Sequence, residues 1–325
     1  LREPAHALAA RPPGEPSVHP STRLRVCGVE FLNAWPLVEP IHDIEVAAPR
    51  FAPGLFHGVE DAGTRALFDP STALPSECTR RLAQNLCDIA LVPVASYVAH
   101  PHWDIIPEIG IGCEGPVETV ILVSDVPLER VAAVHLDAAS RSSATLIRVL
   151  LHQRGLRPRF QVAPHREGVA RVRDRDAALV IGDAAFNLRA RFAHSYDLGA
   201  LWYEATGLPF VFAFWAARPG LVATAPHHVA ALLAARERGR ARTAAYAERY
   251  RDQLVRVSAM NPAVSPDEVL PAAAYRRYLD HTIRYELDAR ARAGLSRFLR
   301  LVRELGIDTD APWAATGDGP GERTR

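Results

Sequence analysis

Residues 197–218 read DLGALWYEATGLPFVFAFWAAR, and the rest of the chain is organised around this stretch. An unbroken apolar run occupies residues 210–217 and ends at Arg218. A run of this length is too short to span a membrane and is typical of a strand buried on both faces. Gly207 and Pro209 precede the run and predict a fixed turn that sets the direction of the strand. From composition alone, a core strand after an ordinary turn is the simplest interpretation.

Three other blocks accompany this stretch. They read VCGVEFLNAWPL at 26–37, SRSSATLIRVLL at 140–151 and IGDAAF at 181–186. In this order, the blocks make the chain resemble the menaquinone-biosynthesis family of chorismate dehydratases in the futalosine route. The resemblance implies an α/β fold with two lobes of the type II periplasmic-binding-protein kind, mainly parallel sheets and a ligand cleft between the lobes. It also implies that the run at 210–217 is one of the strands that cross between the lobes.

Predicted strands and helices alternate along the chain. Strands are expected at 24–31, 44–51, 87–92, 104–111, 117–124, 131–136 and 177–181. Their alternation with helical patterns favours a mainly parallel sheet in each lobe. Because crossing strands leave and return once, we expect a discontinuous first lobe from 23–117 and 211–310 and a second lobe from 118–210. Residues 52–75 read as an irregular insertion with no assigned role.

The two ends of the sequence differ from this pattern. Residues 1–22 contain five prolines and only a short apolar patch, which predicts a disordered leader rather than an export signal. Residues 311–325 are rich in glycine and charge and predict a disordered tail. No stretch has the length and apolarity of a membrane span. We therefore expect a cytoplasmic protein without a membrane partner, and the sequence leaves its oligomeric state open.

Composition excludes several kinds of chemistry. The chain has 325 residues and a net charge of +1, and all 38 of its basic residues are arginine. Without lysine there is no Schiff-base lysine, no lysine-anchored pyridoxal phosphate and no P-loop lysine. The near-neutral charge gives no reason to propose nucleic acid as a partner. The four cysteines lack zinc-like spacing, so we expect free thiols, no metal site and no cofactor.

A cluster of hydroxyls precedes a helical pattern at Ser140, Ser142 and Ser143. The N-terminus of a helix has free backbone N–H groups and the positive end of the helix dipole, and hydroxyl donors beside them make a carboxylate site. An ordinary helix cap is the alternative, since serine is a favoured cap residue. The resemblance matches these serines to the family's S-x-T-S pattern, with Ser142 in place of the usual threonine, and implies that all three bind substrate.

Asn33 follows the first predicted strand, and in open α/β sheets ligands bind at the carboxyl ends of strands. A lone asparagine in a loop is otherwise a turn former. The resemblance implies that Asn33 contacts the substrate and takes part in catalysis. Thr119 lies where relatives carry serine, and it is the second candidate catalytic residue, although a strand threonine satisfied by the sheet is an alternative.

Three further residues belong to the predicted substrate site. The resemblance places Gly182, Asp183 and Gly207 in it. The carboxylate of Asp183 either caps the following helix or faces the cleft.

Three functions remain compatible with the sequence. The first is dehydration of chorismate to 3-[(1-carboxyvinyl)oxy]benzoate, as the resemblance implies. The second is the dihydroxynaphthoate synthase of the same pathway, and the third is a non-catalytic solute-binding protein, because fold alone does not decide function. The TGLPFVFAFW block and the serine cluster favour the first function.

The matched motifs provide anchors for carboxylates but no evident base. Dehydration requires a base near the ring C–H bond, help for the departing hydroxyl and anchors for two carboxylates. The enolpyruvyl carboxylate of the substrate is therefore our first candidate for the base. Glu118 and Asp183 are its rivals.

Overall fold

The computed structural model describes residues 22–47, 64–137, 140–163, 165–260, 269–307 and 309. The predicted leader apart from Thr22, part of the predicted insertion and the predicted tail lie outside these residues. None of the helices within the described ranges is long and apolar enough to cross a membrane. All four cysteines are buried as free thiols, as expected.

A six-stranded sheet forms the base of the first lobe. Its strands run in the order β13, β6, β12, β5, β1 and β4. Their bounds are β1 Leu24–Val29, β4 Phe68–Ala73, β5 Ile89–Pro93, β6 Asp104–Cys113, β12 Phe210–Ala217 and β13 Arg284–Leu287. The sheet therefore combines strands from the two ends of the described chain.

A five-stranded sheet forms the second lobe, in the order β11, β7, β10, β8 and β9. Its strands are β7 Val120–Ser124, β8 Ala133–Asp137, β9 Arg159–Ala163, β10 Asp176–Ile181 and β11 His194–Asp197. A separate two-stranded ribbon pairs β2 Glu45–Ala47 with β3 Thr64–Ala66.

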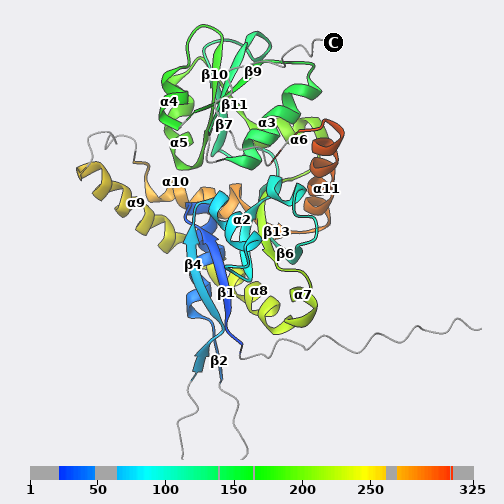
Figure 1. Ribbon diagram of the computed structural model, residues 1–325. Coiled ribbons are helices and arrows are strands. Elements are labelled where there is room, and N and C mark those ends of the chain that lie inside the picture. The colour runs from blue at the N-terminus through cyan, green and yellow to red at the C-terminus, as the bar shows by residue number, and fades with distance from the viewer. Residues whose placement is uncertain are drawn as a thin grey trace, which may run out of the picture.

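Helices surround both sheets, and α11 runs beside the two lobes (Figure 1). It contacts β12 and β13 of the first lobe and α3 of the second. The helices are α1 Trp35–Val38, α2 Pro75–Ala83, α3 Arg141–Gln153, α4 His165–Ala170, α5 Ala185–Leu188, α6 Leu198–Thr206, α7 Leu221–Thr224, α8 Pro226–Arg240, α9 Thr243–Met260, α10 Ala272–Arg277 and α11 Ala289–Glu304.

The strand at 210–217 is buried, as predicted, but it does not lie between the lobes. As β12, it occupies the interior of the first sheet and pairs with β5 and β6, both antiparallel. Trp202, Phe210 and Phe298 pack edge to face behind it, with ring centroids 5.1–6.1 Å apart. The chain crosses between the lobes just before β7 and through α6 instead.

Two expectations about the sheets were wrong. Both sheets are mixed rather than mainly parallel, because β7 and β11 pair antiparallel in the second lobe while β6, β12 and β13 do so in the first. The predicted insertion at 52–75 contains a regular strand, since β4 pairs in parallel with β1 along its whole length. The proline and polar residues of β4 fit an edge strand, where a missing N–H is tolerated.

The carboxylate of Asp197 fixes the crossing point between the lobes. Its two oxygens accept hydrogen bonds from the backbone N–H groups of Val117 and Glu118, at 2.9 and 2.8 Å. The same side chain caps α6 by accepting from Gly199 and Ala200. The Asp197 side chain thus joins the two connections between the lobes, the segment before β7 and the start of α6.

Candidate functional site

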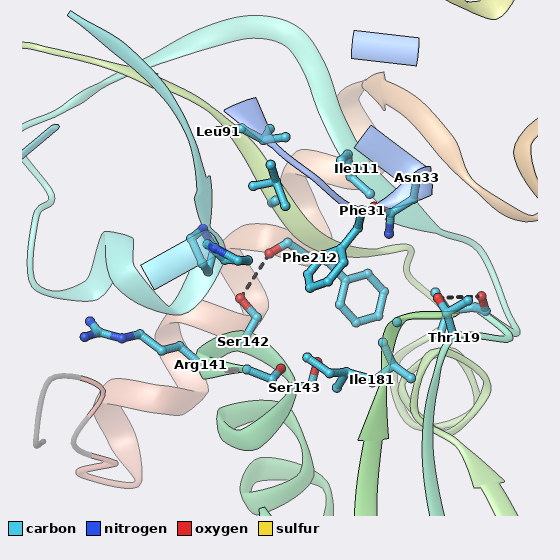
Figure 2. Close-up of a pocket in the computed structure, with 18 residues that line it drawn as sticks. Phe31, Asn33, Leu91, Ile111, Thr119, Arg141, Ser142, Ser143, Ile181 and Phe212 are labelled. Atoms are coloured by element: carbon cyan, nitrogen blue, oxygen red, sulfur yellow. Dashed lines mark hydrogen bonds between the residues drawn. The ribbon is translucent and has the colours of Figure 1, made fainter. Parts of the chain in front are cut away.

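A cleft between the two lobes contains most of the predicted site residues. It contains about 680 Å³ of space, part of it open to solvent. Both lobes contribute apolar walls, from Val29, Phe31, Leu91, Ile111, Ile181 and Phe212. Figure 2 shows Phe31 and Phe212 in the middle of the cleft. These walls suit a flat, partly apolar ligand.

The N-terminus of α3 forms the floor on the side of the second lobe. Ser140 occupies the N-cap position without making a side-chain cap bond, so it is not the ordinary cap that was the alternative. Ser143 lies in the first turn. Neither hydroxyl bonds to another group among the described residues, and both serines line the cleft. Their donors remain available to an anion at the start of the helix, where backbone N–H groups are also available.

Ser142 has a different environment from its two neighbours. Its hydroxyl donates to the backbone carbonyl of Phe212 at 3.0 Å, a bond drawn in Figure 2, and accepts from the N–H of Ala95 at 3.4 Å. Both partners belong to the first lobe. Although Ser142 lines the cleft, its hydroxyl joins the two lobes, and no local sequence pattern indicates this bridge.

Asn33 lies opposite the helix, in the 3₁₀ turn Leu32–Ala34 directly after β1. Its side chain is half-buried and makes no hydrogen bond within the described part of the chain. Figure 2 shows Asn33 and Ser143 approaching the cleft from opposite sides of Phe31. The predicted placement of an amide at the carboxyl end of the first strand is confirmed.

Thr119 also lines the cleft, and its side chain is almost fully buried. Its Oγ1 is 2.9 Å from the hydroxyl of Tyr278 and 3.4 Å from the carbonyl of Val117. Tyr278 was not among the predicted site residues. It lies far away in the sequence, and no local pattern connects it to Thr119.

The two rival bases differ in what the structure describes. Glu118 does not line the described cleft. Its carboxylate accepts a hydrogen bond from Thr282 Oγ1 at 2.8 Å and pairs with Arg277 at 3.6 Å. For Asp183 the structure describes the backbone, in the 3₁₀ turn Gly182–Ala184, but not the side chain. The neighbouring Gly182 lines the cleft beside Phe31.

Gly207 lies outside the described cleft, contrary to expectation. With φ of 65°, it adopts the left-handed conformation that ends α6, and its carbonyl accepts from Arg290. Its role there is to terminate the helix. The family motif around it thus marks a helix end ahead of β12, whose Phe212 does reach the cleft.

Arg141 is the only ionisable residue among the described residues that line the cleft. In Figure 2 its side chain extends away from Asn33. No group of three or more potential metal ligands occurs among the described residues. The cleft therefore offers hydroxyl, amide and N–H donors with apolar walls, an arrangement suited to holding a carboxylated ring.

A family model described as menaquinone biosynthesis matches residues 24–304. The chain belongs to this menaquinone-biosynthesis family. Chorismate dehydratase of Thermus thermophilus is 32% identical over 193 residues, which are 52% of this chain and 68% of that protein. Chorismate dehydratase of Campylobacter jejuni is 30% identical over 93 residues, 28% of this chain and 42% of that protein.

Solved structures share the fold of this menaquinone-biosynthesis family member. A protein from Archaeoglobus fulgidus superposes with a TM-score of 0.62 at 12% identity and covers 89% of this chain and 100% of its own. The periplasmic aliphatic sulphonate binding protein of Escherichia coli gives 0.56 at 16% identity, with 88% and 93% covered. The predicted periplasmic-binding-protein-like fold is confirmed.

Proposed function

We propose that this protein is a chorismate dehydratase, converting chorismate to 3-[(1-carboxyvinyl)oxy]benzoate and water. The observation that carries the proposal is the family match over residues 24–304, with relatives that are named for this activity. The elimination forms an aromatic ring, which drives it forward. The reaction leaves the overall oxidation state unchanged and needs no redox cofactor.

The arrangement of donors supports a substrate with two carboxylates. Ser140 and Ser143 hold one carboxylate at the start of α3, while the amide of Asn33 donates to the other from the first lobe. None of these three side chains has a hydrogen-bond partner within the described residues, so no protein contact has to break when the substrate binds. The aromatic rings of Phe31 and Phe212 contact the faces of the substrate ring.

The substrate itself supplies the base in this proposal. Arg141 is a permanent cation and cannot accept a proton, and the carboxylate of Glu118 is already held by Thr282 and Arg277. The enolpyruvyl carboxylate takes the ring proton, the adjacent C–O bond breaks, and the carboxyl group passes the proton to the departing hydroxide. Water leaves, and no side chain ends in a different protonation state.

Amide substitutions test this assignment of the base. Glu118→Gln and Asp183→Asn are expected to retain single-turnover dehydration within about tenfold of the wild type. Removal of a true general base costs about a hundredfold to ten-thousandfold. A loss of about a thousandfold or more in either variant would exclude the substrate as the base.

A direct assay tests the activity. The purified protein is incubated with chorismate, and the product is followed by ultraviolet absorbance and mass spectrometry. We expect an aromatic product lighter than chorismate by one water. Unchanged chorismate at stoichiometric enzyme concentration would refute the proposed function.

The lobe boundaries and the location of the protein belong to the same proposal. We propose a first lobe from 23–117 and 211–310 and a second from 118–210, and the membership of strands in the two sheets supports these bounds. A biosynthetic enzyme acts where its substrate is made, which favours the cytoplasm, and cell fractionation tests this.

A further inference from the structure

A rare backbone element contacts the residue pair Glu118-Thr119. Residues Tyr278–Thr282 form a single π-helical turn, a form that is frequent at functional sites. From this turn, Tyr278 bonds Thr119 through its hydroxyl, and Thr282 bonds the carboxylate of Glu118. Two hydrogen bonds from one turn therefore fix two consecutive residues at the edge of the cleft.

Either hydroxyl can donate in the Tyr278–Thr119 bond, and the contact between Thr119 and the Val117 carbonyl favours Tyr278 as the donor. The hydroxyl of Thr119 has one proton, and the carbonyl of Val117 at 3.4 Å can only accept. If Tyr278 donates to Thr119, then Thr119 is free to donate to Val117. At that distance the Val117 bond is weak, so a closer acceptor in the cleft would replace it. Tyr278 thus leaves the Thr119 proton available to a ligand.

Both partners in this bond are held firmly. Tyr278 is fully buried, and the ring of Phe186 packs against it edge to face at 5.1 Å. On the other side, Glu118 has a φ of 65°, an uncommon value for a residue with a side chain, and the carboxylate of Asp197 holds its N–H group. The oxygen of the Thr119 hydroxyl is therefore held in one position relative to the cleft.

We infer that Tyr278 is a positioning residue that directs the Thr119 proton toward the hydroxyl group leaving the substrate. The inference rests on the proposed dehydration. A hydrogen bond from Thr119 stabilises the negative charge that develops on this oxygen as the C–O bond breaks. Thr119 keeps its own proton, because the departing oxygen receives the one taken from the ring.

Tyrosine-to-phenylalanine substitutions at two buried positions test the inference. Tyr278→Phe keeps the ring and removes the hydroxyl, and we expect kcat for chorismate to fall about tenfold with KM within about twofold, in line with the loss of one hydrogen bond. Tyr285→Phe is the matched control, because the Tyr285 hydroxyl is buried without a partner among the described residues and lies outside the described cleft. Its kcat should equal that of the wild type.

A double-mutant cycle separates positioning from a general structural effect. Thr119→Val should lose about as much kcat as Tyr278→Phe, and in the Thr119→Val background Tyr278→Phe should cause no further loss. Additive effects, or a wild-type kcat in either single variant, would overturn the inference. If Tyr278→Phe does not fold, the kcat of Thr119→Val tests the inference by itself. A wild-type protein that leaves chorismate unchanged refutes the proposed function instead, and the inference with it.

Discussion

Asn33 and Ser143 present polar groups to the cleft without a protein partner within the described residues. A buried or half-buried polar side chain normally finds a hydrogen bond in the folded protein, and leaving it without one costs stability. Both residues come from segments whose backbone is fixed, one a 3₁₀ turn after β1 and the other the first turn of α3. Their unused donors are thus held in place for a ligand.

Removal of either side chain should weaken catalysis without unfolding the protein. We expect Asn33→Ala and Ser143→Ala each to lower kcat/KM for chorismate about tenfold to a hundredfold, since a hydrogen bond to a charged group contributes about 1.5–3 kcal/mol. The melting temperature should change little. Ser195→Ala is the control, because the Ser195 hydroxyl is also buried without a partner among the described residues but lies on β11, outside the described cleft. Wild-type kinetics in both test variants would contradict the site.

Among the elements, α8 approaches α1 so closely that only glycine fits at the contact. A Cβ atom on Gly239 would lie 1.8 Å from the carbonyl oxygen of Pro36. Helix α1 begins directly after the turn that carries Asn33. The contact between the helices therefore supports the backbone of the cleft as well as the core.

Gly239→Ala should destabilise the protein despite the better helix propensity of alanine. Overpacking costs about 1–3 kcal/mol, against a gain of about 1 kcal/mol in propensity. Thermal and denaturant unfolding should show the loss, and KM should rise because the Asn33 turn shifts. Gly168→Ala in α4 is the control, since the nearest atom to its Cβ would be 3.4 Å away. Equal stability of the two variants would contradict the packing argument.

Sequence patterns predicted the elements better than their pairing. The apolar run was correctly predicted to be a buried strand, and the serines were correctly predicted to precede a helix, because both signals are local. Strand direction was predicted wrongly, since β12 has the same apolar pattern whether its neighbours run parallel or antiparallel. Strand β4 was missed because its proline and polar residues resemble a loop.

Sequence patterns also predicted several residues that line the cleft, while their role in a site stays a prediction. Asn33, Thr119, Gly182 and the three serines all reach the cleft. The bridge from Ser142 to Phe212 and the bond from Tyr278 to Thr119 join residues 70 and 159 positions apart, so only the folded chain shows them.

At the scale of the whole molecule, Ser142 joins the two lobes across the cleft. Its hydroxyl bonds backbone groups of Ala95 and Phe212, which lie on the opposite lobe. Backbone partners keep this bridge independent of side-chain rotamers in the first lobe. The bridge favours the closed arrangement in which the donors of both lobes face one substrate.

Loss of the bridge should shift the protein toward an open form. We expect Ser142→Ala to raise KM for chorismate by about three- to tenfold, the effect of losing about 1 kcal/mol from one neutral hydrogen bond, with a smaller change in kcat. Small-angle scattering of the ligand-free variant should give a larger radius of gyration. Thr145→Val is the control, since among the described residues its hydroxyl bonds only the carbonyl of Arg141, in its own helix. An unchanged radius and KM would show that the bridge does not govern closure.

The position of β12 within the first sheet also affects how the protein is made. Strands β5 and β6 have no common neighbour until residues 210–217 have been synthesised, whereas the whole sheet of the second lobe lies between residues 120 and 197. Domains generally fold as units during synthesis. The second lobe should therefore fold on the nascent chain before β12 is synthesised. The first-lobe strands made earlier cannot complete their sheet until then. Limited proteolysis of nascent chains stalled with residues up to 209 exposed should protect 120–197 and cleave 24–113; the reverse pattern would refute this order of assembly.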